Sequence, residues 1–177
     1  RNLFYHVIWR FYAKKLSPFV TKFYGVTPLR CDFLREAFKI NKNKVELLEL
    51  GVDDHELKSK EKSIIQKIYR EKHQLNSEDF IIVSGGKIDS KKNIHLLVEA
   101  IKKMNLPDVK LILFGTYAPE IKEMIDDLKD SENIIYVGWL NADSIMDYLI
   151  LADLVIFPGT HSVLWEQAVG VGTPCIV

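Results

Sequence analysis

From Asp79 onward the sequence alternates short apolar runs with stretches of helical length, and this alternation restricts the fold more than any other feature. The apolar runs are about five residues long and apolar on consecutive positions, as in strands that are covered on both faces. The stretches between them carry apolar residues at helical spacing. The pattern predicts a Rossmann-like doubly wound α/β domain with a parallel sheet. The predicted strands are 80–84, 109–115, 133–138, 153–158 and 174–177, and the predicted helices are 91–104, 118–130, 141–152 and 162–172.

The part of the chain before Asp79 lacks this regular alternation. Helical periodicity is found at 2–16 and 28–38, and apolar runs of strand length are found at 19–26 and 44–50. A charged stretch at 58–75 predicts a solvated helix that leads into the α/β domain.

Domain limits follow from this change of pattern. We predict that residues 1–55 are the end of an N-terminal domain, that 56–78 form a connecting helical segment, and that 79–177 form the α/β domain, truncated at its C-terminus. The sequence begins at Arg1 without a Met and stops at Val177 inside a predicted strand, so we expect a fragment of a longer protein.

The helical stretch at the amino terminus is amphipathic and basic. Such a helix either lies on a membrane surface or packs its apolar face into the core of its own domain. No signal peptide is apparent, and no apolar stretch approaches the roughly 20 residues that span a bilayer. We therefore expect a cytoplasmic protein, peripheral at most at the inner face of the membrane. The basic residues are Arg10, Lys14 and Lys15, and the apolar ones are Phe4, Val7, Ile8 and Phe11.

Charge and cysteine content exclude several classes of protein. The chain has 24 Lys plus Arg and 24 Asp plus Glu, a balance that does not favour a nucleic-acid partner. Its two cysteines, Cys31 and Cys175, lie far apart in apolar segments, which predicts reduced thiols. No Cys or His cluster has metal-ligand spacing, and we expect neither a metal nor a cofactor.

The segment after the first predicted strand, "SGGKIDSKKN", combines features of an anion site. Gly86 allows the backbone to come close to a ligand, and Lys87 and Lys92 supply positive charge near the start of the next helix. Glycine amides, a helix start and lysines together favour a diphosphate. The alternative is a polar turn with solvated lysines. The segment is neither a Walker A loop nor a GxGxxG fingerprint.

Small and polar residues also follow the other predicted strands. Because ligands bind beyond the carboxyl ends of the strands in open α/β sheets, residues at these positions are candidates for lining one long cleft. A single glycine of this kind indicates only a turn. The candidates are Gly115, Gly138, Gly159, Thr160 and Ser162.

Glu166 is a carboxylate inside the apolar run "LADLVIFPGTHSVLWEQAVGVGTPCIV". An unpaired buried charge costs several kcal/mol or shifts its pKa, so this acid either faces a cleft or is paired. Pairing with a lysine or capping of its own helix is the structural alternative. His161, in the preceding loop, is a candidate to bind a sugar hydroxyl or a diphosphate.

Several segments together resemble one enzyme family. "GKIDSKKNIHLLVEAI", "IIYVGWL", "YLILADLVIFP" and "EQAVGVGTPCIV" resemble conserved stretches of the retaining glycosyltransferases of family 4, the group 1 transferases. "KVELLELGVDDHEL" resembles the end of that family's first domain. The resemblance implies a GT-B fold, in which two Rossmann-like domains face each other, with this chain supplying the donor-binding domain and the end of the acceptor-side domain.

The resemblance also implies roles for individual residues. Glu166 matches the glutamate that binds the donor ribose, and Lys87 and Lys92 match the basic residues at the donor diphosphate. The family usually has a second glutamate eight positions earlier, where this chain has Pro158. "GTHS" stands where that first acid would act, and we regard His161 as a candidate catalytic residue.

The resemblance implies a function as well. We expect the transfer of a sugar from a nucleoside-diphosphate sugar to a sugar or a lipid-linked acceptor, in cell-envelope polysaccharide biosynthesis, with this chain inactive alone. One alternative is a non-catalytic nucleotide-sugar-binding or assembly subunit, which the missing first glutamate favours. Another alternative is an enzyme of the same fold, either a nucleotide-sugar epimerase or a phosphorylase. The spacing around Lys87 and Lys92 disfavours these two enzymes.

Overall fold

The computed structural model describes residues 4–52, 60–128 and 131–177, and these form two compact units, Arg1–Leu50 and Gly51–Val177. Each unit has its own buried cluster of apolar side chains. The expected domain limit at residue 55 falls among residues 53–59, outside the described residues.

Unit 1 is a small α/β segment with a parallel pair of strands, β1 and β2, in which Phe23 is paired with Val45. Its core gathers around Cys31, Ile40 and Val45. The side chain of Thr27 caps α2 by accepting a hydrogen bond from Arg30 N (3.2 Å). The elements are η1 (Phe4–Trp9), α1 (Arg10–Leu16), η2 (Ser17–Phe19), β1 (Phe23–Gly25), α2 (Pro28–Glu36), η3 (Lys42–Lys44) and β2 (Val45–Leu47).

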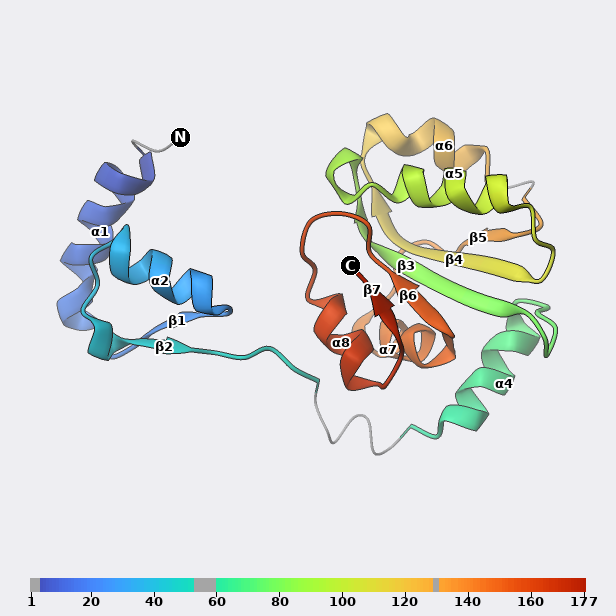
Figure 1. Ribbon diagram of the computed structural model, residues 1–177, viewed down its shortest axis with the longest axis horizontal. Coiled ribbons are helices and arrows are strands. Elements are labelled where there is room, and N and C mark those ends of the chain that lie inside the picture. Colours follow the sequence, from blue (N-terminus) through green and yellow to red (C-terminus); the bar gives the residue numbers. More distant parts are fainter. Residues whose placement is uncertain (1–3, 53–59, 129–130) are drawn as a thin grey trace. The chain divides into compact units, whose positions relative to one another are not determined.

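Unit 2 contains a parallel sheet of five strands, formed by described residues, in the order β5-β4-β3-β6-β7 (Figure 1). The first strand along the chain, β3, is therefore central, with its sequence neighbours on one side and the last two strands on the other. The strands are β3 (Phe80–Ile88), β4 (Val109–Tyr117), β5 (Ile134–Tyr136), β6 (Leu154–Ile156) and β7 (Cys175–Ile176).

Helices cover both faces of this sheet, as the uninterrupted apolar runs predict (Figure 1). Ile81, Val83 and Phe114 pack with residues of α7 and α8, whereas Ile82 and Leu113 pack with residues of α5 and α6. Alternate residues of one strand thus enter two cores. The helices are α4 (Lys62–Lys72), η4 (Ser90–Lys92), α5 (Ile94–Met104), η5 (Pro119–Ile121), α6 (Lys122–Asp126), α7 (Ala142–Leu151) and α8 (Leu164–Gly170).

The two central strands are longer than predicted. We expected β3 to end at Ser84 and an anion-binding loop to follow, but Gly85, Gly86 and Lys87 continue the strand in register with β4, up to the pair Ile88 and Tyr117. Ladder hydrogen bonds use backbone groups alone, so glycine does not end a strand whose neighbour continues beside it. The strand ends instead at Ile88, and the side chain of the next residue, Asp89, accepts a hydrogen bond from Lys91 N (3.0 Å) at the start of η4.

The predicted helices start later than expected where a short 3-10 turn precedes them. The stretches at 91–104 and 118–130 form η4 with α5 and η5 with α6, and residues 129–130 lie outside the described residues. Both cysteines are free thiols, Cys31 buried and Cys175 half-buried. In the part of the chain that the structure describes, no helix has the length and apolar character needed to cross a membrane.

Candidate functional site

The order of the strands places a topological switch point between β3 and β6. The chain moves from β3 outward to β4 and β5, and then returns to the opposite side of β3 with β6 and β7. The loops after β3 and β6 therefore run to opposite faces of the sheet, and the carboxyl ends of strands at such a point are where α/β sheets form the crevice that binds a ligand.

The loop after β3 and the loop after β6 are in direct contact at this point. A Cβ added to Gly159 would lie 2.5 Å from Lys92 Cα, so only glycine permits this close approach. Asn93 Nδ2 donates to Pro158 O (3.1 Å), and Thr160 N donates to Lys91 O (3.4 Å). Residues that are about 65 apart in the sequence thus form one wall of the crevice.

The two candidate phosphate-binding lysines have different surroundings. Lys92 Nζ donates to Thr160 O (2.7 Å) and His161 O (2.9 Å), so it holds the loop after β6. The side chain of Lys87 is 71% exposed and lies 3.6 Å from Asp89 Oδ2. Lys87 is therefore accessible to a ligand, and Lys92 lies among the backbone carbonyls of the second loop.

Glu166 lies in the first turn of α8 and is paired with a histidine. His161 Nε2 is 3.0 Å from Glu166 Oε1, and the His161 ring contacts the Trp165 ring edge to face, with centroids 4.7 Å apart. Ser162 Oγ accepts a hydrogen bond from Leu164 N (3.4 Å) where the helix begins. The structure thus brings together Lys92, His161 and Glu166.

The second oxygen of Glu166 has no partner. Among the described residues, Glu166 Oε2 is buried and makes no hydrogen bond, although 28% of the side chain is exposed. A buried carboxylate oxygen without a donor is costly, and its burial leaves Oε1, on the side of His161, as the oxygen that a bound molecule can approach.

The glycines of the neighbouring strands continue the edge of the crevice. Gly86 and Gly115 are paired across β3 and β4, and Gly115 N donates to Gly138 O (2.7 Å). Tyr136 OH donates to Gly115 O (2.6 Å). Burial, and then the neighbouring Tyr117, raise the pKa of Tyr136, so its hydroxyl remains a donor at neutral pH.

Trp139 was not predicted from the sequence as a candidate site residue. It follows Gly138 at the end of this row, and 71% of its surface is exposed. An aromatic residue directly after a glycine at a strand end is the signal that could have identified it; its exposure alone would not, because single exposed apolar side chains are common on protein surfaces.

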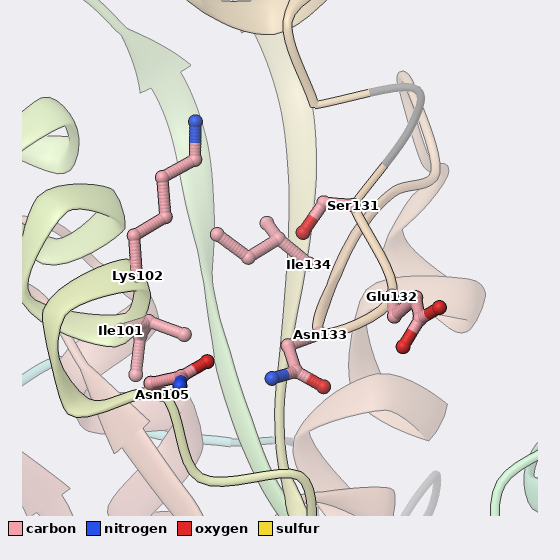
Figure 2. A pocket seen from close by; sticks show the side chains of 7 residues that line it. All are labelled: Ile101, Lys102, Asn105, Ser131, Glu132, Asn133 and Ile134. Carbon is pink, nitrogen blue, oxygen red and sulfur yellow. The ribbon is translucent and has the colours of Figure 1, made fainter.

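A separate cavity of about 230 Å³ lies at the opposite edge of the sheet, between the end of α5 and the start of β5 (Figure 2). Its polar groups serve the local structure. Asn133 accepts a hydrogen bond from Lys110 Nζ (2.9 Å) and donates to Leu106 O (3.2 Å). This edge carries the amino ends of the strands, so we do not assign the cavity to the site. Its lining residues are Ile101, Lys102, Asn105, Ser131, Glu132, Asn133 and Ile134.

Within residues 4–52, 60–128 and 131–177, no group of three or more His, Cys, Asp or Glu side chains is arranged to hold a metal ion. The residues gathered at the crevice are instead lysines, glycines and hydrogen-bonding groups, which suit an anionic ligand with hydroxyls.

Several solved structures share this fold. The chain is similar to HepE from Anabaena in complex with UDP and glucose (16% identity, TM-score 0.71, covering 94% of this chain and 46% of that one). It is also similar to a glycosyltransferase from Rickettsia africae (20% identity, TM-score 0.74, covering 96% of this chain and 47% of that one). A third similar structure is that of WaaG, a glycosyltransferase involved in lipopolysaccharide biosynthesis (17% identity, TM-score 0.70, covering 87% of this chain and 43% of that one).

This chain thus spans less than half the length of each of these three proteins. Their likeness establishes the predicted α/β fold of GT-B type. No curated protein matches the sequence significantly. Residues 65–177 match the family described as glycosyl transferases group 1, which is more than half of the 177 residues. The chain therefore belongs to the group 1 glycosyltransferases.

Proposed function

We propose that this chain binds a nucleoside-diphosphate sugar at the crevice between β3 and β6, and that the whole protein transfers the sugar to an acceptor with retention of configuration, as in family 4. The observation that carries this proposal is the convergence of Lys92, His161 and Glu166 at the switch point of the sheet, with one carboxylate oxygen of Glu166 left unpaired.

Glu166 is suited to bind the ribose of the donor. A carboxylate is a strong acceptor for neighbouring hydroxyls, and a hydrogen bond to a charged group contributes about 1.5–3 kcal/mol. A ribose hydroxyl would donate to Oε1, because Oε2 is buried.

Lys87 and Lys92 are suited to the diphosphate. Transfer requires stabilisation of the charge that develops on the departing diphosphate, and preorganised cationic groups and backbone amides can supply it. Lys87 is exposed near the carboxyl end of β3, and Gly86 next to it has no side chain to obstruct the ligand. No metal is required in this proposal.

Trp139 is suited to the base. Stacking of a base on an aromatic ring contributes about 1–3 kcal/mol and tolerates different bases. Trp139 adjoins Gly138, whose carbonyl is tied to Gly115, so it lies at the same carboxyl edge as the proposed diphosphate site.

The neighbours support this class of donor and a role in the cell envelope. HepE has been solved with UDP-glucose, and WaaG acts in lipopolysaccharide biosynthesis. We extend both properties to this chain as proposals, with a sugar or a lipid-linked molecule as the acceptor.

Contact with the inner face of the membrane is part of the proposal. Within unit 1, the side chains of Phe4, Trp9 and Phe11 are exposed, close in sequence to Lys14 and Lys15. Aromatic and basic residues on one helix favour a surface with anionic lipids. Flotation with vesicles of phosphatidylglycerol and phosphatidylcholine should show binding that requires the anionic lipid. Failure to bind would mean that these aromatic residues pack against protein.

A non-catalytic sugar-nucleotide-binding subunit is the second candidate. It is favoured by Pro158, which stands eight positions before Glu166, where the family usually has its other glutamate. Turnover of the donor by the whole protein separates the two functions, since a binding subunit consumes none.

Ligand-induced thermal stabilisation tests the common part of both candidates. UDP-, GDP- and ADP-sugars should be compared, because a ligand at 100 times its dissociation constant raises the stability by about 2.7 kcal/mol. One of them should raise the melting temperature. If none of them does so at millimolar concentration, the proposed donor site is wrong.

A further inference from the structure

The contact between His161 and Glu166 has a specific geometry. His161 Nε2 lies 3.0 Å from Glu166 Oε1, whereas Glu166 Oε2 is buried and unpaired. The Glu166 side chain is nevertheless 28% exposed, so its exposed surface belongs to Oε1 and the methylene groups. The carboxylate therefore has one oxygen directed inward and the other directed toward His161 and solvent.

His161 is itself held from two sides. Its backbone carbonyl accepts a hydrogen bond from Lys92 Nζ (2.9 Å), which ties the loop after β6 to the loop after β3. Its ring lies against the ring of Trp165 at an interplanar angle of 76°. Both contacts restrict the position of Nε2, so the hydrogen bond to Glu166 comes from a fixed group.

A fixed partner matters because the last torsion of a glutamate is broad and roughly two-fold. Without a partner the carboxylate turns freely, and ordering it would be part of the free energy of binding. With Oε1 held by one hydrogen bond, a second lone pair on Oε1 remains available to a hydroxyl. A group ordered before binding increases affinity for the ligand that matches it.

We infer that His161 is a positioning residue for ribose recognition, which orients the Glu166 carboxylate toward the ribose hydroxyls of the donor. This inference rests on the proposed function. It assigns His161 to the nucleotide half of the donor, whereas the sequence suggested contact with the sugar or the diphosphate. The ligand class that depends on it is the ribonucleotide, in contrast to the deoxyribonucleotide.

The experiment measures selectivity for ribose. The dissociation constants of UDP and 2′-deoxy-UDP are determined by calorimetry, or those of the GDP or ADP pair if that nucleotide binds more tightly. The selectivity ratio is the dissociation constant of the 2′-deoxynucleotide divided by that of the ribonucleotide. This ratio in the original protein is compared with the ratio in His161→Phe, which keeps an aromatic ring without a donor, and in His161→Gln, whose amide can donate to Glu166. His6→Phe makes the same exchange in unit 1 as a control.

We expect His161→Phe to lower the ratio by about threefold to tenfold, in line with the loss of one hydrogen bond to a charged group. His161→Gln should restore most of it, and His6→Phe should leave it unchanged. A general loss of structure would weaken both nucleotides and leave their ratio unchanged.

Two results would overturn the positioning role. An unchanged ratio in His161→Phe would mean that the pair is structural, and a higher ratio would mean that His161 competes with the ribose for Glu166. If the original protein binds neither nucleotide, or binds both equally, the proposed function fails before His161 is tested. Loss of selectivity in Glu166→Gln, with no change in His161→Phe, would reject this inference alone.

Discussion

Glu166 is the residue on which the proposed nucleotide site most depends. Glu166→Ala should weaken the binding of nucleoside diphosphate by about 1.5–3 kcal/mol, because it removes hydrogen bonds to a charged group. Calorimetry with the tightest nucleotide of the panel measures this effect. Glu123→Ala is a matched control, since Glu123 also lies in the first turn of a helix of unit 2. Unchanged affinity with a lower free energy of unfolding would show that Glu166 is a structural partner of His161.

Replacing Lys87 and Lys92 by alanine, one at a time, should have different effects on the binding of UDP and of uridine. Lys87→Ala should weaken UDP binding and leave uridine binding intact, because the exposed Lys87 would contact the diphosphate part of UDP and not the nucleoside. Lys92→Ala should weaken both ligands, because it also releases the carbonyls of Thr160 and His161.

Calorimetry with UDP and uridine distinguishes the two variants, and the GDP or ADP pair replaces them if that nucleotide binds more tightly. Added salt should reduce the effect of Lys87 on UDP, since an exposed charge is screened. Equal losses of UDP and uridine in Lys87→Ala would argue against a diphosphate at this position.

The roles assigned to side chains of the candidate site from sequence remain predictions, and the pairing of these side chains could not be predicted. The nature of Glu166, an acid in an apolar run at the start of a helix, indicated a cleft or a partner. Its partner, His161, is five residues away and acts through a loop whose shape is set by Gly159 and Lys92. Such a contact depends on two loops meeting, which neither loop encodes alone.

At the scale of the elements, the pairing of β3 with β4 depends on Gly115. Its φ is +113°, and an added Cβ would overlap Gly86 O on the neighbouring strand. Gly115→Ala should therefore lower the free energy of unfolding by more than about 3 kcal/mol, because an unfavourable φ alone costs of order 1–3 kcal/mol. Denaturant unfolding measures the difference.

Gly138→Ala is the matched comparison for this substitution. Gly138 also has a positive φ, +77°, but its Cβ position is open, with no described atom within 4 Å. Only the backbone strain should remain, about 1–3 kcal/mol. Equal losses in the two variants would mean that the two strands can move apart to accept a methyl group.

Helix α4 is tied to α7 by polar contacts and is less solvated than its charged sequence predicts. Tyr69 OH donates to Asp147 Oδ2 (3.0 Å), Lys60 Nζ lies 2.5 Å from Asp147 Oδ1, and His73 Nε2 lies 2.7 Å from Tyr148 OH. Burial, and then the hydrogen bond to Asp147, raise the pKa of Tyr69 to about 12. Burial also raises the pKa of Tyr148 to about 12.

His73 should make the stability of this junction depend on pH. Burial, and then the charge of Lys72, lower the pKa of His73 below its ordinary 6.5 in the folded protein. As the pH falls through 6.5, the unfolded chain takes up the proton first, so the folded state loses stability until its own lower pKa is reached. His73→Gln removes this titration and keeps a group that can bond to Tyr148.

Melting temperatures of the original protein and of His73→Gln, measured from about pH 7.5 to about pH 5, test this expectation. The original protein should lose more stability on acidification than the variant. Parallel curves would show that His73 does not contribute to the pH dependence.

The strands and helices were predictable where apolar periodicity is regular, and less so at their ends. All five strands of the sheet overlap the runs from which they were predicted. The extension of β3 to Ile88 was not predictable, because Ser84, Gly85 and Gly86 are typical of turns and continue as a strand only beside β4. Tertiary pairing decides such ends, and single-sequence patterns do not contain it.

At the scale of the whole molecule, binding and transfer should be separable. We expect the chain of 177 residues to bind its nucleotide and to transfer no sugar, since it spans less than half the length of the glycosyltransferases it resembles. Closure of a facing domain over the donor excludes water and completes such sites. Release of nucleoside diphosphate from the donor in the presence of acceptor measures transfer. Turnover by this chain alone would reject the two-domain interpretation.

The central position of β3 has a consequence for folding during synthesis on the ribosome. β3 is the first strand of unit 2 to be made, but β6, which covers its second edge, ends only at Ile156. At a synthesis rate of about 5–20 residues per second, that edge of β3 remains unpaired for on the order of 3–14 s until β6 has been made. An apolar strand with unpaired amides and carbonyls is a template for wrong pairing. Chaperones that bind nascent chains should therefore be found on Phe80–Ile88 until β6 has emerged.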